Sequence, residues 1–164
     1  MSLLRRNLLI MAGLSLAIVL AACSGLPKPT PVEVSISADA NINPGEAGEP
    51  SPVVVRIYEL KGIKAFNNAS FFDFDDDAKL LGADLISSRE YELTPGTEKK
   101  YDSRISSEAA YIGVVVSFRD IQSATWRDSV ELKKSKQNRF MVYITSLAVR
   151  IQKYSRFTFG KSGA

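Results

Sequence analysis

The side chain best placed for chemistry in this sequence is that of Cys23, the only cysteine among 164 residues. It follows a basic start at Arg5 and Arg6, an apolar run over residues 8–20, and two alanines. A positive start, an apolar run of about 7 to 15 residues and small residues before a cleavage point are the parts of a secretory signal. A cysteine at that point predicts a lipid-attachment site, and the alternative is an ordinary signal peptide that happens to end in cysteine.

The segment Leu20-Ala21-Ala22-Cys23 resembles the bacterial lipobox. That resemblance implies that the thiol takes a diacylglycerol, that the chain is cut before Cys23, and that the new amine is acylated. Each buried methylene contributes about 0.8 kcal/mol, so three acyl chains would hold the protein at a membrane without a spanning helix. Ser24 stands where lipoproteins retained in the inner membrane often carry Asp, which implies the outer membrane.

These features divide the chain into four parts. We expect a cleaved lipoprotein signal peptide over residues 1–22, a lipidated tether over 23–31, a folded domain over 32–154 and a C-terminal tail over 155–164. Three prolines favour an extended conformation for the tether. A single domain is expected, because about 140 residues can bury one hydrophobic core.

The sequence lacks residues on which common catalytic and metal sites depend. It has no histidine, and Cys23 is assigned to lipid. Ser, Cys and Thr nucleophiles usually need a histidine or a similar base, and zinc sites draw mainly on Cys and His. Loss of Arg5 and Arg6 with the signal lowers the formal charge from +3 to +1, which gives no support for nucleic-acid binding. We therefore expect no enzyme activity, no cofactor besides the lipid, and no nucleic-acid or small-molecule substrate.

The acidic run Asp73–Asp77 is a candidate calcium site. Its carboxylates occupy positions one, three and five of a calcium loop, and Asp84 falls at position twelve. However, Ala78 stands where an EF-hand loop needs glycine for its sharp turn. A solvated turn or a group of helix-capping carboxylates explains the run more simply.

Three other features also have simpler structural interpretations. Carboxylate pairs for glycoside hydrolysis could come from Glu90 with Glu92 or Asp75 with Asp77, but nothing predicts a substrate cleft. The basic run Lys133–Arg139 could attract phosphates or lipid headgroups, although a hairpin loop kept soluble by lysines suffices to explain it. Trp126, the only tryptophan, fits core packing better than an exposed partner surface.

The elements that must position these residues are mostly strands. Apolar and polar residues alternate over Val32–Ala38, β-branched residues fill Val53–Leu60, and Ala110–Phe118 is apolar enough to be covered on both faces. A short aromatic helix is expected within Phe66–Phe74. Further strands are expected at 86–93, 98–105, 126–132, 139–147 and 148–153, the first two as an antiparallel pair around the turn at Thr94–Thr97. This pattern predicts an all-β sandwich with a small helical insertion.

A long loop, Asp39–Pro52, separates the first two predicted strands and is rich in Asn, Pro and Gly. Such a density of turn formers excludes a strand or helix interior. Loops longer than about 12 residues are uncommon in compact domains and are often functional. A binding role and a passive connection both stay open for this loop.

The sequence resembles the TssJ family, the outer-membrane lipoproteins of type VI secretion systems. The resemblance rests on the lipobox and on two segments around the long loop, Ala38–Pro44 and Pro50–Leu60. Further matches follow in the family's order at Phe66, Ala69–Phe72, Asp76 with Asp77, Leu81–Leu85 and Glu92–Gly96. Together they cover most of the expected domain.

This resemblance implies a transthyretin-like β-sandwich of two sheets, held at the outer membrane and facing the periplasm, without catalytic activity. It implies that the protein anchors the type VI membrane complex by binding the periplasmic C-terminal domain of TssM, and through it the complex that contains TssL. In the family this contact is associated with the loop between the first two strands, which corresponds here to residues 40–51. The partner-binding residues expected in the loop are Asn41, Ile42, Asn43, Pro44, Gly45, Glu46, Gly48 and Glu49.

Two other hypotheses fit the same anchor. The first is a periplasmic ligand- or calcium-binding envelope lipoprotein that uses the carboxylates of Asp73–Asp77. The second is a small scaffolding lipoprotein without a TssM-like partner.

Overall fold

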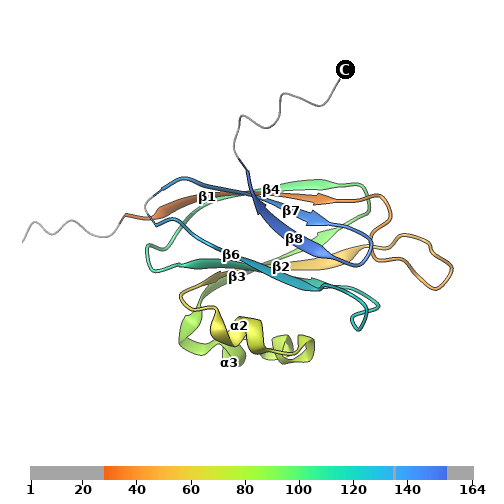
Figure 1. Cartoon of the computed structure of the whole chain (residues 1–164), viewed down its shortest axis with the longest axis horizontal. Helices are drawn as coiled ribbons and strands as arrows, with labels where there is room; N and C mark the ends of the chain where they lie inside the picture. The colour runs from red at the N-terminus through yellow and green to blue at the C-terminus, as the bar shows by residue number, and fades with distance from the viewer. Residues whose placement is uncertain (1–27, 135, 155–164) are drawn as a thin grey trace, which may run out of the picture.

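The computed structural model describes residues 28–134 and 136–154, and this part of the chain forms two four-stranded sheets (Figure 1). The first, here called the β1 sheet, consists of β4 (Glu98–Ile105), β1 (Thr30–Ala38), β7 (Asn138–Ile144) and β8 (Val149–Lys153), in that spatial order. The second, the β2 sheet, consists of β3 (Leu85–Leu93), β2 (Val53–Leu60), β5 (Tyr111–Ser117) and β6 (Arg127–Glu131). The predicted two-sheet β-sandwich is confirmed.

Alternating apolar residues bury the inner faces of both sheets. In β1 every second residue is buried, from Val32 to Ala38, as the sequence predicts. The inner face of β2 is buried in the same way from Val53 to Glu59. β1 begins at Thr30, so the last two residues of the expected tether belong to the strand. An extended proline is compatible with that position, because its fixed φ lies within the range of a strand edge.

The expected pairing of β3 with β4 is wrong. β3 pairs with β2, whereas β4 pairs with β1 in the opposite sheet. The turn at Thr94–Thr97 therefore carries the chain from one sheet to the other. Gly96 has a positive φ of 75° in this turn, and the Thr97 N–H donates to the Thr94 carbonyl at 3.3 Å. A tight turn reverses the chain without fixing which neighbour each strand joins, so the turn signal alone could not predict the pairing.

The basic run Lys133–Arg139, here called the lysine-rich segment, likewise does not form the expected hairpin loop. It connects β6 of the β2 sheet to β7 of the β1 sheet, and β7 pairs in parallel with β1.

β7 ends at Ile144, three residues before the predicted end of that strand. The prediction of a core strand covered on both faces is confirmed for β5, whose residues Ile112–Val116 are buried without interruption.

Between β2 and β3 a helical excursion, residues 61–84, covers the outer face of the β2 sheet (Figure 1). It is longer than the expected single helix and contains α2 (Lys64–Asn68), the 3-10 helix η1 (Phe71–Asp76), α3 (Asp77–Leu81) and the 3-10 helix η2 (Gly82–Asp84). Phe66 and Phe74 pack with Tyr58 of β2, with ring centroids 5.4 to 5.9 Å apart. The Phe66 ring lies so close to β5 that a Cβ atom at Gly113 would come within 2.7 Å of it.

Several expected features lie outside the described residues. These are the signal peptide, Cys23, the tether before Lys28 and the tail after Tyr154. Within residues 28–134 and 136–154, every helix is too short and too polar to cross a membrane.

Candidate functional site

The connections that contain the expected partner-binding residues gather at one end of the sandwich. The loop between β1 and β2 projects from this end, opposite the start of β1 (Figure 1). The β3–β4 turn meets its base, because the Ala38 N–H donates to the Thr97 carbonyl at 2.9 Å and the Gly96 N–H donates to the Asp39 carbonyl at 3.0 Å. The connection after β5 and the turn after β7 complete the group. We call this end, with residues 39–52, 94–97, 118–126 and 145–148, the loop end.

Two buried residues fix the base of the β1–β2 loop. The Ile42 side chain is fully buried and packs with the inter-sheet core. The Asn43 side chain, only 3% exposed, donates to the Pro52 carbonyl at 2.8 Å and accepts from the Arg119 N–H at 2.8 Å. The Asn43 N–H also donates to the Ser146 carbonyl at 2.8 Å. Asn43 thus ties the β1–β2 loop to the connection after β5 through its side chain and to the turn after β7 through its backbone N–H.

Asn43 itself adopts a left-handed backbone conformation with φ of 48°. Asn tolerates this region better than most residues, because its short polar side chain can hydrogen-bond locally. Asparagine therefore meets both demands of the position, the backbone angle and the two side-chain hydrogen bonds.

The tip of the loop is a compact turn. The Gly45 N–H donates to the Glu49 carbonyl at 2.8 Å, and the Gly48 N–H donates to the Gly45 carbonyl at 3.0 Å. Gly48 has φ of 85°, which a residue with a Cβ atom adopts only with strain. Glu46 and Glu49 are exposed at this tip. The loop is therefore folded upon itself rather than extended.

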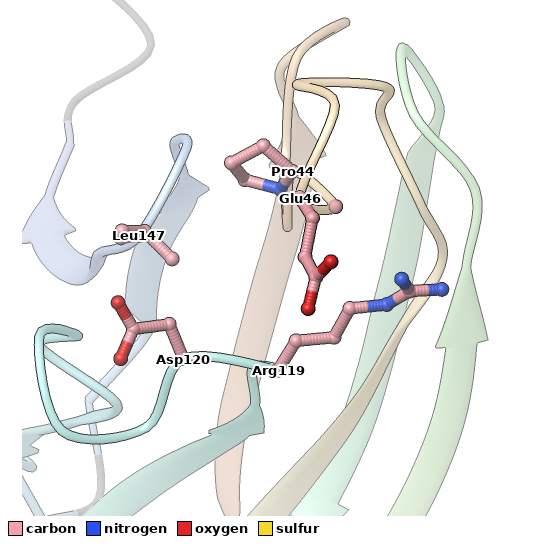
Figure 2. A pocket seen from close by; sticks show the side chains of 6 residues that line it. Pro44, Glu46, Arg119, Asp120 and Leu147 are labelled. Atoms are coloured by element: carbon pink, nitrogen blue, oxygen red, sulfur yellow. The ribbon is translucent and has the colours of Figure 1, made fainter.

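A groove of about 570 Å³ runs between the tip and the neighbouring connections (Figure 2). Pro44 and Leu147 supply its apolar wall, and the side chains of Glu46, Arg119 and Asp120 supply its charges. No ion pair between described residues includes the Arg119 guanidinium. Hydrogen bonds from Ser123 lower the pKa of Asp120 below its ordinary value, so this carboxylate is charged at neutral pH.

The structure brings the expected loop residues together but gives them different surroundings. Asn41, Glu46, Gly48 and Glu49 are exposed, and Pro44 with Gly45 is half-buried. Ile42 and Asn43 are buried, so they position the loop rather than offer surface. Sequence reasoning missed Arg119, Asp120 and Leu147, which line the groove from distant connections. Arg119 and Asp120 directly follow the predicted strand Ala110–Phe118, whereas Leu147 falls within the predicted strand 139–147. Nothing in the sequence showed that these residues would share one end of the sandwich.

The acidic run caps helices. Asp73 and Ser70 form a reciprocal capping box at η1, in which the Ser70 N–H donates to Asp73 Oδ2 at 2.7 Å. Asp76 caps α3 by accepting from the Lys79 N–H at 3.1 Å. The expected helix-capping role is thus confirmed for these two carboxylates. In the part of the chain that the structure describes, no three acidic, histidine or cysteine side chains converge on a metal position.

The remaining candidates also have structural roles. Glu90 pairs with Arg56 on the surface at 3.0 Å. Trp126 is half-buried and packs edge-on against Phe71 and Phe74, which confirms its expected core role.

Comparison with known proteins agrees with this architecture. A family described as type VI secretion lipoprotein (VasD, EvfM, TssJ) matches residues 30–147. The structure is similar to the lipoprotein TssJ1 from Pseudomonas aeruginosa, with 30% identity, a TM-score of 0.75 and coverage of 77% of this chain and 98% of that chain. It is also similar to Lip from Serratia marcescens, a membrane-bound component of the type VI system, with 26% identity, a TM-score of 0.70 and coverage of 77% and 99%.

A third similar chain occurs in a structure described as the TssM C-terminal domain from EAEC, with 26% identity, a TM-score of 0.60 and coverage of 74% of this chain and 97% of that chain. None of the curated protein sequences matches the chain. The family match covers more than half of the sequence and includes the strands and connections that build the loop end. The chain belongs to the type VI secretion lipoprotein family that contains TssJ.

Proposed function

We propose that this protein is a non-catalytic outer-membrane lipoprotein that anchors the type VI secretion membrane complex by binding the periplasmic C-terminal domain of TssM. Acyl chains on Cys23 hold it in the membrane after removal of residues 1–22. Residues 23–29 lead to the sandwich domain, whose first strand begins at Thr30, and residues 155–164 form the tail. The loop end contacts TssM, which connects the lipoprotein to the complex that contains TssL.

The observation that carries this proposal is the position of the β1–β2 loop. β1 starts next to the tether and ends at the loop, and its nine residues span about 30 Å. An anchor before β1 therefore directs the loop away from the membrane surface and towards a periplasmic partner.

The build of the loop also suits binding. Its base is fixed by Ile42 and Asn43, and its tip is closed by backbone hydrogen bonds. A loop already held in one conformation loses less conformational entropy when a partner binds. Asp39, Glu46, Glu49 and Asp120 give this end an acidic surface, with Arg119 as the basic exception. Charge complementarity favours a basic region on the partner.

Similarity supports the choice of partner and the absence of catalysis. A chain similar to this one occurs in the structure described as the TssM C-terminal domain, and the matched family is described as a secretion lipoprotein. The sequence also lacks histidine, the residue that most often serves as a general acid or base.

Binding to the TssM periplasmic domain of the same bacterium tests the proposal. The full mature lipoprotein in detergent is titrated against that domain by calorimetry. Glu46→Lys with Glu49→Lys should weaken binding by about tenfold or more, because both charges lie at the exposed tip. Glu92→Lys with Glu131→Lys makes the same charge change at exposed strand positions and should leave affinity unchanged. Equal affinity for the parent and the tip variant would refute the loop contact.

The anchor needs a separate test. The intact mass of the protein extracted from envelopes should exceed that of the unmodified chain from Cys23 onward by a diacylglycerol and one further acyl chain. The Cys23→Ser variant should lack this added mass. Density-gradient separation of the envelope should place the parent in the outer-membrane fraction. A parent protein with no added lipid mass would contradict the anchor without bearing on TssM binding in solution.

A further inference from the structure

The two ends of the sandwich differ in charge. The connections opposite the loop end, together with the start of β1, form what we call the tether end. The loop end has several acidic residues, namely Asp39, Glu46, Glu49 and Asp120, and Arg119 is basic. At the tether end the acidic residues are Glu108, paired with Lys61 at 2.8 Å, Glu131 at the end of β6, and Asp84, whose backbone carbonyl accepts from the Lys61 N–H. The helical excursion that begins here also carries Asp73, Asp75, Asp76 and Asp77. The basic residues there are Lys28, Lys61, Arg104, Lys133, Lys134 and Lys136.

Strand register places the lysine-rich segment at the tether end. Asn138, the first residue of β7, lies beside Val32 in the parallel pair with β1. The lysines that precede Asn138 are therefore close to the point where the chain enters the domain. Arg104 of β4 lies opposite Pro31 on the other side of β1.

A buried asparagine binds the backbone of Lys133 and Lys136. The Asn138 side chain, 4% exposed, accepts from the Lys133 N–H at 2.8 Å. It also donates to the carbonyls of Lys133 at 2.9 Å and Lys136 at 2.8 Å. Asn138 thus satisfies three backbone groups of Lys133 and Lys136, and the side chains of Lys133, Lys134 and Lys136 are exposed. No ion pair between described residues uses these three lysines.

The tether is short enough to keep this turn near the membrane. Six residues lie between Cys23 and Thr30, and the seven steps from Cα to Cα span at most roughly 25 Å when fully extended. A tether of this length lets the clustered lysines come within a Debye length of about 8 to 10 Å of the bilayer, the range over which they attract anionic headgroups.

We propose that Lys133, Lys134 and Lys136 form a membrane-facing surface that binds the anionic phospholipids of the leaflet holding the acyl chains. This inference rests on the proposed anchor at Cys23. Attraction at the tether end and repulsion at the acidic loop end act in the same direction. Together they orient β1 away from the bilayer and present the loop end to the periplasm.

Vesicle binding of the chain from Ser24 onward, without lipid, tests this surface. Such a chain is suitable because the similar Pseudomonas and Serratia structures are covered to 98% and 99% by the matched region, so that region folds without a leader. Binding is measured by co-sedimentation with vesicles of phosphatidylethanolamine and phosphatidylglycerol. Vesicles of phosphatidylethanolamine and phosphatidylcholine serve as the neutral reference.

We expect binding to the anionic vesicles that falls as salt rises towards about 0.15 M. Lys133→Gln, Lys134→Gln and Lys136→Gln together should weaken it by on the order of a hundredfold, at about fivefold for each lysine near the surface. Lys79→Gln, Lys100→Gln and Arg150→Gln remove the same charge from exposed positions elsewhere and should cost much less. Thermal melting must show that both triple variants are folded.

Three outcomes would overturn the inference. They are equal binding to neutral and anionic vesicles, equal losses in the two triple variants, or lysine-dependent binding to purified cell-wall sacculi without binding to vesicles. None of them involves TssM, so failure here is distinguishable from failure of the proposed function.

Discussion

The two faces of the β2 sheet are covered by layers that differ in chemistry and in how they are held. The inner face packs on the β1 sheet through aliphatic residues such as Val55, Ile57 and Val114. The outer face packs on the helical excursion through aromatic rings, including Phe66 and Phe74. β2 and β5 contribute to both layers, so the same two strands belong to two different cores.

The layers also differ in their polar contacts. In a sheet, the backbone N–H and C=O groups of neighbouring strands hydrogen-bond to one another. The aliphatic layer therefore needs few side-chain hydrogen bonds. Short helices leave carbonyls unpaired at their ends, and the aromatic layer meets this need with arginines. Arg127 of β6 donates to the carbonyls of Phe66, Asn67 and Ala69 at the end of α2. Arg56 of β2 donates to the Phe74 carbonyl at 2.8 Å.

Removal of an aromatic ring should have the largest effect on stability. Phe66 is fully buried between Tyr58, Phe74 and Gly113. Phe66→Ala should lower the free energy of unfolding by about 3 to 5 kcal/mol, because it removes a large apolar surface and leaves a cavity. Urea unfolding measures the loss.

The same experiment shows whether the two layers unfold together. Trp126 contacts both hydrophobic clusters, so its fluorescence reports on the two layers at once. We expect the fluorescence and far-UV circular dichroism transitions of Phe66→Ala to coincide. Separate transitions would show that the helical excursion unfolds on its own and that the aliphatic layer does not depend on it.

Loss of the arginine contacts should rank second. Arg127→Met keeps most of the stem but removes the donors for three carbonyls, which should cost about 2 kcal/mol. Arg104→Met is the matched control, because Arg104 is exposed on an edge strand. If the two variants have equal denaturation midpoints, the arginine does not hold the aromatic layer.

A smaller effect should follow from the hydrogen bond that crosses the aliphatic layer. The Tyr101 hydroxyl of β4 donates to the buried carboxylate of Glu59 in β2 at 2.8 Å. Tyr101→Phe should cost about 1 to 2 kcal/mol, because Glu59 then loses a buried partner. Glu59→Gln measured alone and together with Tyr101→Phe gives the coupling between the two side chains.

The pH dependence of stability provides an independent check on this bond. Burial, together with the neighbouring Glu59 carboxylate, raises the pKa of Tyr101 to about 12. Unfolded tyrosine titrates near pH 10, so the folded state holds this proton more tightly. The resulting stability is complete below about pH 10 and is lost as the pH rises towards about 12. Tyr101→Phe should flatten the alkaline decline, and an unchanged decline would contradict the pKa assignment.

The smallest change is expected at Tyr58, in the aromatic layer. Its hydroxyl is buried and makes no hydrogen bond within the described residues. Tyr58→Phe should therefore leave stability unchanged or raise it by up to about 1 kcal/mol. A loss as large as that of Tyr101→Phe would show that a bound water or another group satisfies the Tyr58 hydroxyl.

The aliphatic layer could be predicted from the sequence more fully than the aromatic layer. Alternation located β1 and the face that it buries, because a strand has a period of two residues, and β-branched residues located β2. The aromatic residues follow no such period. A group of rings around Phe66–Phe74 indicated a short helix, but the number and bounds of the helical turns depend on contacts with Arg56 and Arg127, which are distant in sequence.

The loop end shows the same limit. Turn-forming residues predicted the β1–β2 loop, but they could not show that Ile42 belongs to the core or that Asn43 joins three connections. These roles depend on which strands are neighbours. The incorrect pairing of β3 with β4 has the same origin, because local signals mark chain reversals and not sheet membership.

The place of β1 within its sheet has a mechanical consequence. β1 is an interior strand, flanked by β4 over Thr30–Ser37 and by β7 over Val32–Ala38. A pulling force between the tether and the β1–β2 loop acts along this strand, roughly perpendicular to the hydrogen bonds on both sides. Such a force loads those hydrogen bonds in shear and all at once, whereas an edge strand peeled from one end breaks them in succession. β1 can therefore bear a load applied between its two ends without the sandwich opening strand by strand.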